Sequence, residues 1–263
     1  MRLSHKLVIF SLIVLVLAGC QTHAKTTATY DTIHSEQENK EKVPERGTLN
    51  QVENDELAKA VAGEVNQDGI TVVADPDSPL VIVNKDRMLP EGYEPTDLVI
   101  PNVPFQAVNE ERKHLRLPAA EALEELFAAA EEAGVELVAV SGFRRYETQE
   151  FLYNYSVEQN GEEYANKYSA QPGHSEHQTG LAMDVSTASI AFRLVEEFEE
   201  TPEGQWIEEN AHQYGFVVRY PKGKSEITGY NYEPWHLRYV GEEVATEIAE
   251  QNMTIETYFG LVE

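Results

Sequence analysis

The chain has 263 residues, of which 41% are hydrophobic, and a single cysteine, which excludes an internal disulfide. It carries 46 acidic and 20 basic residues, for a formal charge of −26 at pH 7. A field of this sign repels nucleic acid and anionic lipid surfaces, so we expect no nucleic-acid partner. An anionic substrate would therefore need a local cationic site.

The first 19 residues are typical of a secretory signal, because Arg2 and Lys6 precede a short apolar run over residues 7–17. An uncleaved membrane anchor is the alternative, although the run is short for a membrane span. The Leu-Ala-Gly-Cys motif that ends at Cys20 resembles the lipobox of bacterial lipoproteins, in which this cysteine is lipidated and becomes the mature N-terminus. We therefore expect a lipid-anchored, extracytoplasmic protein, with a cysteine lost during ordinary signal cleavage as the alternative.

Residues 20–65 are polar and poor in aromatic residues, and residues 36–46 are dense in Glu and Lys. Such a segment cannot bury enough apolar surface to fold alone, so it predicts a disordered tether with at most a short helix near residues 53–62. As a coil it would span roughly 35–40 Å. The remaining residues, 66–263, are predicted to form one domain.

The domain pattern predicts helices and strands that do not alternate regularly, and tight turns join several strands. This favours an α+β fold, a single small domain with a mainly antiparallel sheet and flanking helices. The predicted elements, in chain order, are a strand over 80–83, a helix over 119–133, a strand over 135–141, a helix over 146–159, a strand over 180–186, helices over 190–199 and 205–214, strands over 216–220 and 235–240, and a helix over 241–251.

Three candidate metal ligands, His174, His177 and Asp184, lie within residues 171–185, and His236 lies on another predicted strand. A catalytic zinc takes three protein ligands of N or O type and keeps a position open for water. Asp184 lies on a predicted buried strand, where a carboxylate is costly unless it is paired or binds a cation. Spacing alone does not decide which histidines join it, and a lone histidine is more often a core or surface residue.

Glu233 precedes His236 by three residues, so in a regular strand the two side chains would face opposite sides. Pro234 removes a backbone donor and restricts Glu233, and a local break there would bring Glu233 toward the metal. A carboxylate so placed takes a proton from water and returns it to the leaving amine. The alternative is an ordinary surface glutamate.

These residues resemble the VanY-type D-alanyl-D-alanine carboxypeptidase family over roughly residues 78–258. The matching motifs are Ser175-x-His177-x-x-Gly180-x-Ala182-x-Asp184, Glu233-x-x-His236, Ser141-Gly-Phe-Arg-Arg-Tyr-x-x-Gln149 and Asn84-Lys-x-x-x-Leu89-Pro-x-x-Tyr93-x-Pro-x-Asp97-Leu. The resemblance implies the small α+β fold of the Hedgehog signalling domain. It also implies one zinc ion held by His177, Asp184 and His236, with Glu233 as general base and His174 outside the ligand set.

A peptidase also needs a cation beside the attacked carbonyl oxygen, and an exopeptidase needs a partner for the free carboxylate. The resemblance implies that Arg144 and Ser175 share these tasks and that Gln149 lines the pocket. Tyr153 is a further candidate for substrate binding, and three other aromatic residues are candidates for the cleft wall or the core. These three are Tyr230, Tyr232 and Trp235.

We therefore expect a monomeric zinc D-alanyl-D-alanine carboxypeptidase that removes the terminal D-alanine of peptidoglycan stem peptides. An L,D-carboxypeptidase acting on tetrapeptide stems is the first alternative, because the motifs do not read the residue before the cut. A non-catalytic wall-binding lipoprotein is the second, and the presence of Glu233 speaks against it.

Overall fold

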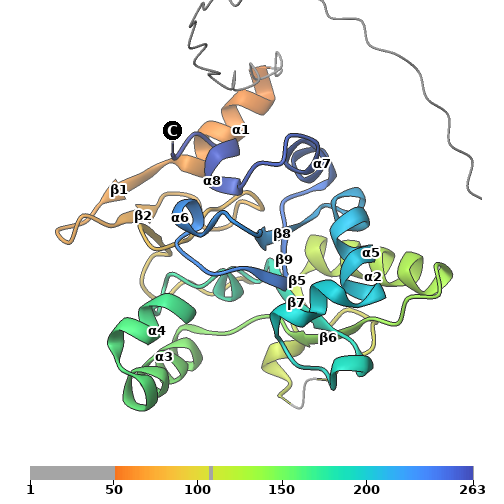
Figure 1. Ribbon diagram of the computed structural model, residues 1–263. Helices are drawn as coiled ribbons and strands as arrows, with labels where there is room; N and C mark the ends of the chain where they lie inside the picture. Colours follow the sequence, from red (N-terminus) through yellow and green to blue (C-terminus); the bar gives the residue numbers. More distant parts are fainter. Residues whose placement is uncertain (1–50, 107–108, 263) are drawn as a thin grey trace, which may run out of the picture. The chain divides into compact units, whose positions relative to one another are not determined.

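The structure is a computed structural model that describes residues 51–106 and 109–262 (Figure 1). Helices are combined in it with sheets that are mainly antiparallel, which confirms the predicted α+β class. Its main elements are α1 (Gln51–Val61), β1 (Gly63–Val65), β2 (Thr71–Val73), β3 (Arg87–Met88), β4 (Leu98–Val99), β5 (Leu115–Arg116), α2 (Leu117–Glu132), β6 (Val138–Ser141), α3 (Tyr146–Asn160), α4 (Glu162–Tyr168), η2 (Glu176–Thr179, a 3-10 turn), β7 (Ala182–Ser186), α5 (Pro202–Asn210), β8 (Phe216–Tyr220), α6 (Ser225–Thr228), β9 (Glu233–Tyr239), α7 (Glu242–Glu250) and α8 (Ile255–Tyr258).

A four-stranded sheet in the order β6-β7-β9-β8 lies at the centre, and all its neighbouring strands are antiparallel. Successive residues of a strand point to opposite faces, and here the two faces differ in chemistry. Met183, Val185 and Leu237 belong to the larger hydrophobic core together with the apolar side of α2. Asp184 and His236, which alternate with them, point to the other face.

Helix α2 covers the apolar face because its hydrophobic residues recur at helical spacing. The buried residues are Ala119, Ala120, Leu123, Leu126, Phe127 and Ala130. Pro118 lies in the first helical turn, where a missing N–H costs nothing, and Gly134 follows the helix with φ +77°. In Figure 1, α2 and α5 lie to the right of the sheet, whereas α3 and α4 lie at the lower left.

Two predicted elements are wrong. Residues 80–83 form no strand, although Val81, Ile82 and Val83 are fully buried. Arginine side chains replace a neighbouring strand as donors to their carbonyl groups, Arg238 to Val81 O (2.5 Å) and Arg87 to Ile82 O (3.2 Å). The hydrophobic run therefore predicted correctly that this segment is buried. It did not indicate which groups would form hydrogen bonds with its backbone.

The helix predicted over residues 190–199 is also absent, and two short 3-10 turns, Ala188–Ile190 and Glu196–Glu200, take its place. Ala191 and Phe192 have positive φ angles of 56° and 57°, which end the first turn. The acidic residues of the second turn would lie at the C-terminal end of the predicted helix, where negative charge is unfavourable. The short helix α4 was not predicted.

The folded domain begins earlier than the predicted boundary at residue 66. Leu57 and Ala60 of α1 are buried in the second hydrophobic core, which also contains Val240, Ile248 and Tyr258. Strand β1 pairs with β2 in an antiparallel register. The last part of the predicted tether is therefore packed on the domain.

The predicted signal segment, Cys20 and residues 20–50 of the tether lie outside the described residues. Within residues 51–106 and 109–262, none of the helices has both the length and the apolar character that a membrane crossing requires.

Candidate active site

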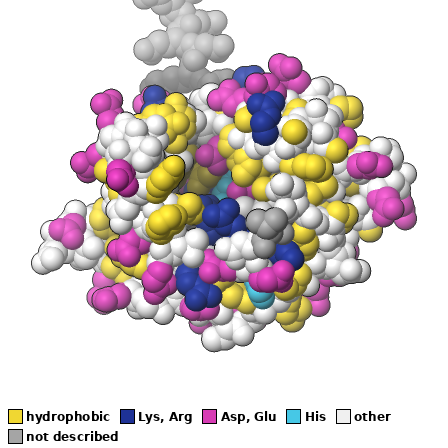
Figure 2. Space-filling view, turned by 90° about the horizontal axis from the view of Figure 1, so that it is seen from below, with side chains coloured by type: hydrophobic (Ala, Val, Ile, Leu, Met, Phe, Trp, Pro, Cys, Tyr) yellow, Lys and Arg dark blue, Asp and Glu magenta, His cyan; other side chains and the backbone are white. Residues whose placement is uncertain are grey.

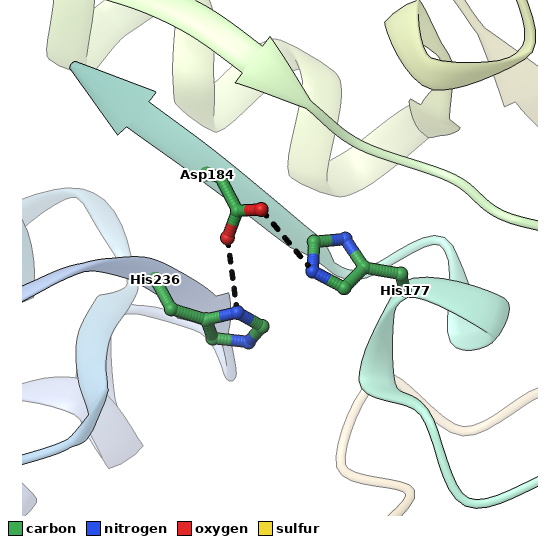
Figure 3. Close-up of side chains that lie close together, drawn as sticks. All are labelled: His177, Asp184 and His236. Carbon is green, nitrogen blue, oxygen red and sulfur yellow. Dashed lines mark ion pairs between the residues drawn. The ribbon is translucent and has the colours of Figure 1, made fainter. Parts of the chain in front are cut away.

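The three predicted metal ligands meet on the open face of the central sheet (Figure 3). Asp184 of β7 lies directly opposite His236 of β9 in the strand register, and His177 approaches from η2. One ligand atom from each residue lies within 4.8 Å of the others, and all three side chains are buried. The arrangement brings two imidazoles and one carboxylate to a common point, as a tetrahedral zinc site requires.

The ring of His177 is oriented by a backbone carbonyl. Its Nδ1 donates to Gly142 O at 2.8 Å, which leaves the lone pair of Nε2 directed toward Asp184, whose Oδ2 lies 3.5 Å away. Gly142 is required at this place, since a Cβ there would lie 2.5 Å from His114 O. Its lack of a side chain therefore allows the close approach of the backbone segments that hold the carbonyl in position.

Asp184 and His236 are close without forming a good hydrogen bond. His236 Nδ1 lies 3.1 Å from Asp184 Oδ1, yet this buried oxygen has no hydrogen-bond partner among the described residues. A buried carboxylate oxygen without a hydrogen bond is costly and calls for an explanation. A metal ion between the three residues explains it, so the donor set fits a bound cation.

Glu233 reaches the same point because β9 is irregular. Val218 of β8 pairs with Leu237, whereas Tyr220 pairs with Glu233, so β9 has two residues more than β8 over this stretch. The predicted local break near Pro234 is thus confirmed. Glu233 Oε2 lies 3.8 Å from His236 Nδ1, and burial raises the pKa of Glu233 to about 7.

A cavity of about 210 Å³ opens over these side chains. Its walls include all three predicted ligands and Glu233, together with Arg144, Gln149, Tyr168, Ser169, Ala170, Ser175, Glu176, Leu194, Tyr220, Tyr230 and Trp235. Figure 2 shows a hollow on this face at which basic, acidic and histidine side chains gather, with hydrophobic side chains beside it. A small molecule or a peptide end can enter it.

Arg144 supplies the cationic group that the sequence predicted. It is half-buried, lines the cavity, and its Nε has no hydrogen-bond partner among the described residues. Its backbone N–H donates to His177 O at 3.1 Å, which ties the arginine to the segment that carries a ligand. The side chain is therefore placed to bind an anionic group in the cavity.

Ser175 and Gln149 also line the cavity, as predicted, and both are buried. Gln149 donates through Nε2 to Ala170 O at 2.7 Å, and its buried Oε1 has no partner within the described part of the chain. This oxygen is available to accept a hydrogen bond from a ligand.

Tyr153 and Tyr232 were predicted near the cleft, but neither lines the cavity. The Tyr153 hydroxyl donates to Asn166 Oδ1 at 2.7 Å and thereby joins α3 to α4, and its role in substrate binding stays a prediction. Tyr232 lies beside Lys222, whose Nζ is 5.5 Å from the ring centroid. Tyr230 and Trp235 do form part of the wall.

His174 is not part of the metal group, in agreement with the family resemblance. It is buried, and its Nδ1 lies 2.7 Å from Asn84 O. Tyr168 and Tyr220 in the wall and Glu176 beside His236 were not predicted from the sequence. Glu176 stands at an unspecified position of the motif, and in a chain with 46 acidic residues nothing local distinguishes it.

Comparison with known proteins decides the family. The family described as VanY, D-alanyl-D-alanine carboxypeptidase, matches residues 112–242. The putative carboxypeptidase YodJ of Bacillus subtilis (strain 168) is 48% identical over 193 residues, which cover 73% of this chain and 71% of that protein. This chain belongs to the VanY family.

Two solved structures extend the comparison. That of the LdcB LD-carboxypeptidase has a TM-score of 0.72 and 46% identity, and covers 76% of this chain and 95% of that one. That of a mutant D,D-pentapeptidase VanY from a VanB-type resistance cassette, in complex with Zn(II), has a TM-score of 0.55 and 32% identity, and covers 68% and 97%. The predicted VanY-family fold and the predicted class, a peptidase of the hydrolases, are therefore confirmed.

Proposed function

We propose that this VanY-family protein is a zinc-dependent carboxypeptidase that releases the terminal D-alanine of peptidoglycan stem peptides. The observation that carries the proposal is the buried group of His177, Asp184 and His236, with Glu233 beside it in one cavity. The donor set is the two-histidine, one-carboxylate type that suits a catalytic zinc. The Zn(II) bound to the VanY neighbour supports the same metal.

In this proposal His177, Asp184 and His236 hold the ion. When bound, zinc supplies Lewis acidity and lowers the pKa of water at the open position. Glu233 takes the proton of the attacking water and delivers it to the departing amino group of D-alanine. A pKa near neutrality suits both halves of this task, because the group must accept a proton in one step and release it in the next.

Arg144, Ser175 and Gln149 bind the end of the peptide. The guanidinium of Arg144 pairs with negative charge, either on the attacked carbonyl oxygen or on the terminal carboxylate, with Ser175 as the second donor. In a protein of charge −26, this local cation is what allows an anionic peptide end to approach.

Two substrates fit this site. A D,D-carboxypeptidase cuts the D-Ala-D-Ala bond of a pentapeptide stem, as the family description suggests. An L,D-carboxypeptidase cuts the last bond of a tetrapeptide stem. The likeness to the LdcB LD-carboxypeptidase, at 46% identity and a TM-score of 0.72, exceeds that to the D,D-pentapeptidase, at 32% and 0.55, and this favours the L,D candidate.

The deciding experiment is mass spectrometry of purified tetrapeptide and pentapeptide muropeptides before and after incubation with a chain of residues 51–263 loaded with zinc. Loss of one alanine from either substrate supports the carboxypeptidase proposal, and the faster substrate decides between the two candidates. A matched substrate with an amidated terminal residue should react roughly ten- to a hundredfold more slowly, because it lacks the charge-assisted contact. Cleavage at an internal bond, or equal rates on amidated and free peptides, would contradict the proposal.

We further propose that the domain works outside the cell, tethered to the membrane through lipid on Cys20. The proposal rests on the N-terminal sequence, in which a short apolar run precedes Leu-Ala-Gly-Cys. Peptidoglycan stem peptides are found on that side of the membrane, so the proposed location agrees with the proposed substrate.

A further inference from the structure

Glu176, the neighbour of the proposed ligand His177, is a buried carboxylate whose role the hydrolysis does not explain. Its side chain has no solvent exposure. Oε2 lies 3.2 Å from Nε2 of His236, on the side of the ring away from Asp184. The opposite ring nitrogen, Nδ1, is the one that faces Asp184 Oδ1 at 3.1 Å.

The other oxygen of Glu176 is held by two arginines. Arg219 donates from Nε to Oε1 at 2.6 Å, and Arg238 donates from Nη1 to the same atom at 2.9 Å. Both guanidinium groups are fully buried. They lower the pKa of Glu176 well below its usual range despite the opposing effect of burial, and they restrict its rotation, so that Oε2 remains directed at His236.

The two arginines have further partners that fix their own positions. Arg219 makes two hydrogen bonds to Glu256 of α8, at 2.6 Å and 3.0 Å, and Arg238 donates to the carbonyl groups of Pro79 and Val81. The cluster thus contains two buried carboxylates and two buried guanidinium groups, and its charges balance. Such clusters are expensive to desolvate, and good geometry with complete hydrogen bonding is what makes them tolerable.

We propose that Glu176 is a positioning residue that keeps the proton of His236 on Nε2 and thereby directs the lone pair of Nδ1 at the metal. This inference rests on the proposed metal site. A neutral imidazole donates from one nitrogen and accepts at the other, so an obligate acceptor at Nε2 determines the tautomer. A carboxylate partner also makes the ligating nitrogen a better donor to the metal.

Glu176→Gln tests the tautomer directly. The side-chain oxygen of glutamine pairs with the arginines, so its NH₂ group faces Nε2 of His236. That nitrogen must then accept a hydrogen bond, which moves the ring proton to Nδ1 and blocks the ligating lone pair. Loss of such a partner typically costs about 10–100-fold in metal affinity.

The matched control is Glu256→Gln, which neutralises a buried carboxylate of the same cluster that contacts Arg219 but not His236. Zinc dissociation constants are measured by competition with a chromogenic chelator, after circular dichroism has shown that each variant is folded. We expect Glu176→Gln to bind zinc roughly 10–100-fold more weakly and Glu256→Gln to stay within about threefold of the wild type. The absorption spectrum of bound Co(II) should change only in Glu176→Gln. Unchanged affinity in Glu176→Gln, or equal losses in both variants, would show that the cluster is only structural.

If Glu176→Gln does not fold, the tautomer of His236 can still be determined in the wild type. In the zinc-loaded protein, nitrogen-15 NMR should find the His236 ring proton on Nε2 and protected from exchange. A proton on Nδ1, with zinc on Nε2, would overturn the inference. A wild type that binds no zinc would instead refute the proposed metal site, so the two failures are distinguishable.

Discussion

Burial changes the acid–base chemistry of Glu233. Loss of solvent raises its pKa to about 7, with His236 and Arg144 opposing the shift. A buried acid of this kind is protonated below its pKa and can act as a base only above it. A zinc ion nearby favours the ionised form, so in the loaded enzyme the transition falls at or below neutrality.

We therefore expect Glu233→Gln to reduce kcat at least roughly a hundredfold while zinc content and folding stay intact, because glutamine holds water but cannot take its proton. In the wild type, activity should fall as pH falls through the pKa of Glu233, since protonation removes the base. The residual activity of the variant should lack this acidic limb. Steady-state kinetics across pH, with elemental analysis, test this. Near-normal activity of Glu233→Gln would show that Glu233 is not the general base. Loss of zinc from the variant would show that Glu233 is a metal ligand.

Removal of a proposed ligand should act on the metal first. His177→Ala and Asp184→Ala each leave two of the three donor groups, and we expect both to lose most of their zinc. His174→Ala is the control, because this buried histidine contacts Asn84 O and lies outside the metal group. Elemental analysis after dialysis gives the occupancy, and full zinc in either ligand variant would refute the assignment. Chelators should also act faster at acid pH, because the ligands must be deprotonated to bind.

At the scale of elements, irregularities of the sheet shape the site as much as its regular pairs do. The extra residues in β9 bring Glu233 and His236 together, and β6 is shifted by one residue against β7 between Ala139 and Ser141, next to Asp184. Bulges of this kind turn side chains out of the regular alternation and are common beside active sites. The sequence indicated the first through Pro234, whereas nothing local marked the second.

Helix α5 offers a test of an element held by close backbone contact. Thr201 caps its start by accepting from Gly204 N at 3.0 Å, and a Cβ on Gly204 would lie 1.9 Å from Phe198 O. Alanine normally stabilises a helix interior by about 1 kcal/mol over glycine. Here we expect Gly204→Ala to destabilise by about 1–3 kcal/mol, because backbone atoms must shift. Thermal denaturation should show a lower Tm for Gly204→Ala, whereas the control Gln205→Ala, at an exposed position, should have a Tm close to that of the wild type. A raised Tm for Gly204→Ala would contradict the close contact between Gly204 and Phe198 O.

At the scale of the whole molecule, the structure assigns α1 and β1 to the folded domain. Arg87 Nη2 lies 3.4 Å from Ala60 O, so α1 also contacts the domain through its backbone, in addition to the buried Leu57. A chain that starts at residue 66 should be less stable than one that starts at residue 51 by about 2–4 kcal/mol, from lost apolar burial. The Tm should fall by roughly 2–4 °C for each kcal/mol. Leu57→Ala in the longer chain should show part of this loss of stability. Equal Tm values for the two chains would support the predicted domain boundary at residue 66.

The proposed anchor is tested on the full-length protein in its host cell. We expect the wild type to partition into the detergent phase, because two acyl chains give stable membrane binding. Cys20→Ser should lose this behaviour and lack incorporated lipid label. Unchanged partitioning in the variant would show that another segment holds the protein at the membrane.

The sequence by itself determined the features that depend on local pattern. The helical spacing of apolar residues predicted α2, and the motif residues His177, Asp184, Glu233 and His236 predicted the group that the structure brings together. Strands β8 and β9 were also expected close to their observed bounds. Periodicity and residue type carry this information because each is set within a few positions along the chain.

Only the tertiary structure decided the features that depend on partners far apart in sequence. Glu176 acquires its place from Arg219 and Arg238, which are 43 and 62 positions away. Residues 81–83 are buried without a strand because arginine side chains satisfy two of their carbonyl groups. Tyr153 faces Asn166 instead of the cavity. Burial of a charged or polar group is tolerated only when its partners arrive from elsewhere, and no local pattern specifies which residues those will be.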